Sequence, residues 1–250
     1  MATTGTESDR AADAGPPEGL KAATGRFGYR ITSGMLAGML CGAVIGGLGG
    51  RLAMFVLRLT SDDRIRGLET DDGFEIGSFT GSTFFLVVVT TLMGVATSLL
   101  YLATRRFVPL RHRSLAAAIA FGALASALIL QPGKFDFTAV EPPVLIVALF
   151  LLIPAAYGFA LSRLVERWLA DPDASRPWYA MLPLLILALT GPLGIAILLV
   201  LGLGFVIGDR FTVVSRVWQS SAVLWTGRTL LSALVVVMGV DTVQAATEII

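Results

Sequence analysis

Long apolar segments alternating with short polar ones set the pattern of this chain. A helix needs about 20 apolar residues to cross the roughly 30 Å hydrocarbon core of a bilayer. Five runs meet this requirement: 31–57, 83–103, 114–130, 144–164 and 178–207. A further run after Trp218 brings the expected total to about six spans. The pattern therefore predicts an all-α, polytopic transmembrane helical bundle over 30–250.

The last apolar run contains two ionisable residues, and its register decides which of them lies at the bilayer centre. A helix over 218–240 would centre Arg228, whereas a helix over 229–250 would bury Asp241. A charge at the centre costs at least about 2.5 kcal/mol unless it is solvated or paired. We therefore expect an intermediate register, with Arg228 toward the outside, at the depth of Arg51, and Asp241 toward the cytoplasm.

Composition agrees with a membrane location. Hydrophobic residues make up 55% of the chain and charged residues 15%, whereas charged residues approach a quarter of a typical soluble domain. The net charge is +1 and the cations are dispersed, which argues against nucleic acid as a partner. The lipid bilayer is the expected partner.

The orientation of the bundle follows from its basic loops. Arginines gather after the second and fourth runs: Arg105, Arg106, Arg111, Arg113, Arg163, Arg167 and Arg176. Because short cytoplasmic loops are enriched in Lys and Arg, both loops are assigned to the cytoplasm. Residues 1–29 lack an apolar stretch and contain adjacent Pro16 and Pro17, which predicts a disordered cytoplasmic tail and no signal peptide. With six spans, both termini would be cytoplasmic.

The first span carries five glycines at an unbroken interval of four: Gly34, Gly38, Gly42, Gly46 and Gly50. Such a glycine zipper leaves a smooth groove in which a second helix can approach closely. The pattern predicts helix packing. The groove could be filled by a neighbour in the same chain, by a second copy or by another membrane protein.

An acidic loop follows the first span. Asp71 and Asp72 could bind a divalent cation, but their spacing does not match an EF-hand loop. Ion pairs with the neighbouring arginines are the favoured interpretation, and no metal ligand is assigned. If Arg51 and Arg228 share a depth, they form an external polar cluster with this loop, either the mouth of a solute path or a structural clasp.

The fifth run is interrupted near its middle by Gly191 and Pro192. Proline removes a backbone donor and clashes with the preceding turn, so the helix should kink or break there. Broken helices line binding sites in many transporters, although a simple kink is the favoured interpretation.

Catalytic signatures are absent from the sequence. His112 is the only histidine and lies in an arginine-rich loop, which excludes a bis-histidine haem or an HExxH zinc site within the membrane. The glycine-rich first span lacks the lysine of a phosphate-binding loop. We therefore expect no enzyme activity, no catalytic residue and no cofactor.

Several segments resemble one group of proteins: Gly49 to Met54, Asp71 to Gly77, Phe135 to Phe137, Pro154, and Tyr157 to Gly158. They are similar to a family of uncharacterised actinobacterial multi-pass membrane proteins. The resemblance covers roughly the first four spans. It implies a bacterial cytoplasmic (inner) membrane location and carries over no activity.

Two functional interpretations follow from these patterns. The broken fifth span and the polar residues near span ends favour a small permease or channel-like subunit. Alternatively, the chain is a non-transporting scaffold or accessory protein that binds a partner through the glycine groove and the acidic external loop.

Overall fold

The computed structural model describes residues 20–60, 81–132, 142–170 and 220–250. Helices account for most of this part of the chain, and it contains no strand. Three sequence predictions lie outside the described residues: the acidic loop with Asp71 and Asp72, the span over 178–207 with Gly191 and Pro192, and the tail over 1–19.

The first span is a continuous helical column of three consecutive segments: α2 (Leu20–Cys41), a π-helical segment η1 (Gly42–Gly49) and α3 (Gly50–Thr60). It begins earlier than expected. Residues 20–29 are helical instead of belonging to an irregular tail, in keeping with the good helix formers Leu20 and Lys21 at the start.

The remaining described helices follow the apolar runs closely. They are α4 (Gly81–Thr104), the 3₁₀ turns η3 (Arg105–Phe107) and η4 (Leu110–His112), α5 (Arg113–Ile129), α7 (Pro143–Leu169) and α11 (Ser221–Ile249). Within the described part of the chain, five helices are long and apolar enough to cross a bilayer. The predicted all-helical fold with several helices able to span a membrane is therefore confirmed, and the exact number of spans stays a prediction.

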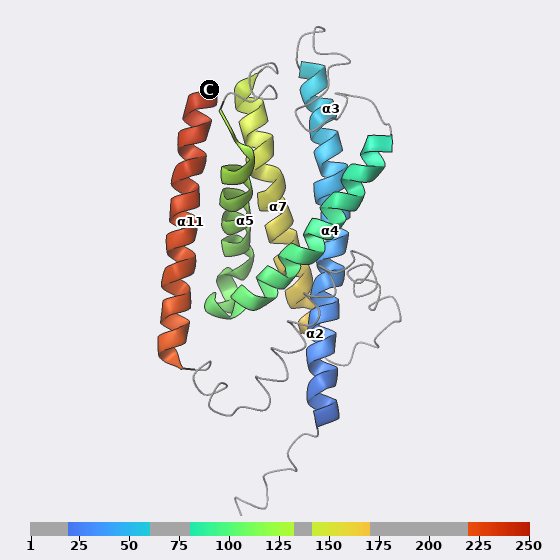
Figure 1. Ribbon diagram of the computed structural model, residues 1–250, viewed down its shortest axis with the longest axis vertical. Coiled ribbons are helices and arrows are strands. Elements are labelled where there is room, and N and C mark those ends of the chain that lie inside the picture. Colours follow the sequence, from blue (N-terminus) through green and yellow to red (C-terminus); the bar gives the residue numbers. More distant parts are fainter. Residues whose placement is uncertain (1–19, 61–80, 133–141, 171–219) are drawn as a thin grey trace, which may run out of the picture.

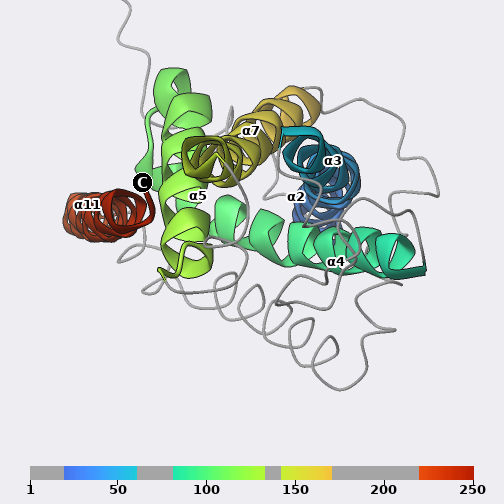
Figure 2. The same ribbon diagram turned by 90° about the horizontal axis from the view of Figure 1, so that it is seen from above.

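The long helices lie side by side, with α4 crossing the bundle obliquely (Figure 1). In the view from above, α11 lies at one edge of the bundle beside α5, and the column of α2 and α3 lies beyond α7 (Figure 2). Within the described part, α5 packs mainly on α7, α2 mainly on α4, and α11 mainly on α5. α11 is consequently the most peripheral of the described helices.

The direction of α11 differs from the sequence expectation. Its first residues lie at the end of the bundle where α4 and α7 end (Figure 1), and Arg228 Nε donates to the Phe107 carbonyl at 3.0 Å. Near its other end, Ile249 packs on the cluster around Leu57. Asp241, and not Arg228, therefore belongs to the half of the bundle that holds α3.

The expected register, with Arg228 at the depth of Arg51, was wrong because it assumed one crossing between α7 and α11. The start of α2 and the end of α11 also lie at opposite ends of the bundle (Figure 1). The placement of both termini on the cytoplasmic side therefore stays a prediction that this arrangement of the described helices does not support. The intervening residues 171–219 lie outside the described part of the chain.

The glycine stripe of the first span lies against α4. A methyl group added at Gly38 would collide with the backbone carbonyl of Gly94, and one added at Gly42 would collide with that of Thr90. A methyl group added at Gly34 would likewise collide, here with the Leu102 side chain. Gly46 is in looser contact, with Thr90, and a methyl group at Gly50 would have nothing within 4 Å. α4 thus fills the groove along most of its length.

We predict that Gly38→Ala destabilises the protein by about 1–3 kcal/mol, the usual cost of overpacking a close contact. The matched Gly50→Ala should be neutral, or stabilising by up to about 1 kcal/mol through helix propensity. Thermal unfolding of the purified protein in detergent would measure both changes. Equal destabilisation by the two substitutions would contradict the assigned packing.

Candidate functional site

The polar cluster expected from the sequence is not assembled among the described residues. Arg51 is only 4% exposed on α3, where its Nη1 lies 3.8 Å from the Met54 sulfur. Asp241 is exposed on α11. Arg228 lies at the opposite end of the bundle from α3, and its guanidinium also stacks 5.2 Å above the Trp225 ring.

A different polar cluster joins α4, α5 and α7 at the arginine-rich end, with Glu166 at its centre. Glu166 Oε1 accepts a hydrogen bond from the Tyr101 hydroxyl at 2.9 Å and lies 3.5 Å from Arg105 Nε. Glu166 Oε2 accepts a hydrogen bond from Arg113 Nη1, also at 2.9 Å. One carboxylate therefore holds two arginines and a tyrosine in place.

Helical spacing brings these groups together. On α7, Ser162 and Glu166 are four residues apart and share a face, and both contact Tyr101, since its hydroxyl lies 2.8 Å from Ser162 Oγ. One turn earlier on α4, Thr97 Oγ1 lies 2.6 Å from the Tyr157 hydroxyl. A ladder of hydroxyl groups thus joins α4 to α7, as buried polar groups in lipid require.

The turn between α4 and α5 uses arginines to satisfy its carbonyl groups. Carbonyls at a helix end lack partners within the helix. Arg113 Nε donates to the Val108 carbonyl at 3.1 Å, and Arg228 Nε donates to Phe107. Gly227 lies so close to the Phe107 ring that a methyl group there would collide with it. These contacts attach the start of α11 to the turn.

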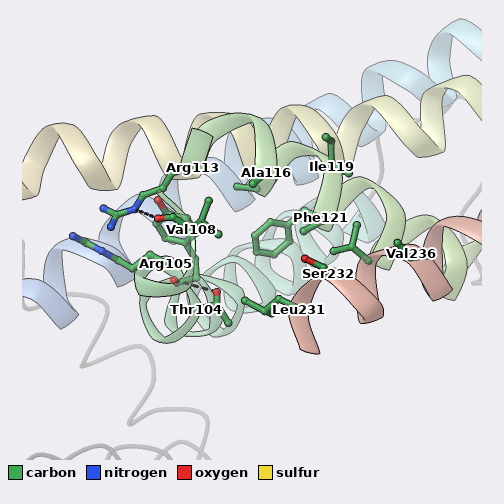
Figure 3. A pocket seen from close by; sticks show the side chains of 14 residues that line it. Thr104, Arg105, Val108, Arg113, Ala116, Ile119, Phe121, Leu231, Ser232 and Val236 are labelled. Carbon is green, nitrogen blue, oxygen red and sulfur yellow. Dashed lines mark hydrogen bonds between the residues drawn. The ribbon is translucent and has the colours of Figure 1, made fainter. Parts of the chain in front are cut away.

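A cavity of about 400 Å³ lies between α4, α5 and α11 beside this cluster. Its size is within the range of small-molecule sites. Arg105 and Arg113 lie toward one end, and apolar residues such as Phe121 and Val236 line the rest (Figure 3). The full lining is Tyr101, Thr104, Arg105, Val108, Arg113, Ala116, Ala117, Ile119, Ala120, Phe121, Leu231, Ser232, Val235 and Val236.

A narrower cavity of about 90 Å³ continues from the first. The two share Thr104, Ala120, Phe121, Leu231 and Val235. The second extends the apolar lining on α11 as far as Met238. Together they form an apolar cleft with two cationic groups near one end.

Positive charge dominates this end of the bundle. The described arginines there include Arg30, Arg105, Arg106, Arg111, Arg113, Arg163, Arg167 and Arg228, and Glu166 is the one described carboxylate among them. Glu166 contributes one negative charge against the two positive charges of Arg105 and Arg113, so this group keeps a net positive charge. The site therefore favours an anion.

The cluster shows what the sequence interpretation missed. From the sequence, the loop arginines indicate only the orientation of the chain, and Glu166 lies outside the predicted span 144–164 and has no assigned role. The available signal was a lone carboxylate in an arginine-rich stretch, Arg163 to Arg167. Among the described residues, no three His, Cys, Asp or Glu side chains gather closely enough to hold a metal ion.

No protein-family model, curated protein or solved structure matches the chain. The resemblance to actinobacterial membrane proteins therefore stays a prediction.

We predict that Glu166→Gln destabilises the protein by about 2 kcal/mol, because hydrogen bonds to charged groups contribute about 1.5–3 kcal/mol. Glu248→Gln, at an exposed carboxylate near the end of α11, is the matched control and should have little effect. Thermal unfolding in detergent would compare them. A double-mutant cycle with Arg113→Gln should give non-additive losses of unfolding free energy. Strictly additive losses would contradict a direct interaction between Glu166 and Arg113.

Proposed function

We propose that this chain is a small permease-like membrane subunit that admits anionic, partly apolar compounds through the cavity beside Arg105 and Arg113. The observation that supports the proposal is the lining of that cavity. Its charged lining residues are both arginines, and most of its remaining wall is apolar. A compound that carries both an anionic and an apolar part satisfies both kinds of surface.

The proposed setting is the cytoplasmic membrane of a bacterium. The arginine-rich end would face the cytoplasm, because cytoplasmic loops carry the excess of arginine. The start of α2 lies at the same end (Figure 1), which supports a cytoplasmic position for the N-terminal side as well. The anion would then reach the cavity from the cytoplasmic half of the bilayer. We propose no catalytic role.

The scaffold interpretation has less support. It relied on the glycine groove as a binding surface for a second copy or another membrane protein, and α4 packs against Gly34, Gly38 and Gly42. Its other surface, the acidic loop, lies outside the described residues. Gly50 alone of the stripe faces open space, which is a small area for a partner.

Flux measurements in liposomes that contain the purified full-length chain would test the permease proposal. Octanesulfonate is a suitable probe because it combines a permanent negative charge with an apolar tail. We predict that the protein raises its efflux several-fold above that of protein-free liposomes. Efflux of octyltrimethylammonium, a cation with the same tail, should not change, because the arginines repel it.

Arg105→Gln should reduce octanesulfonate efflux about tenfold, the loss expected for one charge-assisted hydrogen bond. Arg111→Gln is the matched control, because Arg111 is exposed and does not line the cavity. Equal efflux of anion and cation, or no efflux above protein-free liposomes, would refute the proposal.

A further inference from the structure

We infer that the compound held in this cavity is an anionic phospholipid from the leaflet at the arginine-rich end. One acyl chain would lie between α4, α5 and α11, and the phosphate would lie at Arg105 and Arg113. The inference rests on the proposed function, because it names the substrate class of the same site. Three features of the cleft support it: depth, lateral access and charge.

The depth of the cleft matches one leaflet. Arg228 lies level with the turn that carries Arg105, and Met238 is the furthest lining residue on α11. At 1.5 Å per residue, the helix rises about 15 Å between them. This is half of the roughly 30 Å hydrocarbon core. An acyl chain that enters beside the arginines would therefore end near the bilayer midplane.

The cleft is open to the side, where lipid would lie. Ile119 and Val236 line the cavity, yet they are 53% and 64% exposed. On the same helix as Val236, Leu230 and Leu234 are exposed apolar residues. A lipid chain could enter along the exposed apolar residues of α5 and α11 without leaving an apolar environment. A small hydrophilic anion would instead have to be surrounded by this apolar wall, which is unfavourable.

The arginines retain hydrogen-bonding capacity for a phosphate. Glu166 engages Arg105 through Nε and Arg113 through Nη1, and Val108 engages Arg113 Nε. Within the described part of the chain, no acceptor is assigned to the Nη atoms of Arg105 or to Nη2 of Arg113. Paired guanidinium groups suit phosphate oxygens. Anionic lipids of the cytoplasmic leaflet are attracted to basic residues at that surface.

Lipid binding to the purified full-length chain in neutral detergent would test the inference. Phosphatidylglycerol should raise the melting temperature and should stay bound in native mass spectrometry. Phosphatidylcholine with the same acyl chains, and inorganic phosphate alone, should do neither. Equal stabilisation by phosphatidylcholine would contradict recognition of the anionic headgroup, and a full shift with inorganic phosphate would show that a free anion is the ligand.

Substitutions locate the binding to the cavity. Arg105→Gln should weaken phosphatidylglycerol binding about tenfold. Ala120→Phe should weaken it to a similar extent by filling the space that both cavities share, without changing any charge. Leu115→Phe, at an exposed site on the same helix that lines neither cavity, is the matched control. Unchanged binding in Ala120→Phe would overturn the inference, even if Arg105→Gln failed to fold.

The lipid and flux measurements separate this inference from the proposed function. Octanesulfonate efflux without phosphatidylglycerol binding would leave the permease proposal intact and refute the lipid assignment. Phosphatidylglycerol binding that is sensitive to Ala120→Phe, without octanesulfonate efflux, would support the lipid site and refute the permease proposal. A second polypeptide at the cleft would be detected as a protein-sized mass in place of the lipid, and would also refute the lipid assignment.

Discussion

The carboxylate of Glu166 is the interaction on which the arginine-rich end depends. It binds Tyr101 of α4, Arg113 of α5 and the nearby Arg105, and so holds three helices together. Lipid gives apolar helices no hydrophobic reason to associate, which makes such polar contacts and close packing decisive. The same contact positions both cationic groups of the cavity. The same carboxylate therefore stabilises this end of the bundle and positions the proposed anion site.

Two other contacts complete the arrangement. Glycines of the first span bring α2 into backbone contact with α4 through Gly38 and Gly94, which fixes the column against the bundle. At the far side, Arg228 and Gly227 attach the start of α11 to Phe107. From there α4 and α11 diverge (Figure 1), and the cleft opens between them beside α5. Close packing on one flank thus coexists with an open, charged cavity on the other.

Hydropathy alone predicted the described spans within a few residues at most ends, because crossing a bilayer requires a long apolar helix. The spacing of the glycines identified the packing stripe of the first span, since residues four apart lie on one face of a helix. Hydropathy could not predict the direction of α11, which depends on how residues 171–219 connect α7 to it. The Glu166 cluster was equally hidden, because it joins residues from three helices through contacts distant in sequence.

The direction of α11 is the central claim, because a reversed helix would remove the α11 wall of the cavity and the contact between Arg228 and Phe107. Cross-linking with a short thiol-reactive reagent, in a Cys41→Ala background, tests it most directly. We predict an efficient cross-link between cysteines introduced at Phe107 and Gly227, which are in contact, and none between cysteines at Arg51 and Arg228. The opposite result, with cross-linking only between positions 51 and 228, would contradict the account.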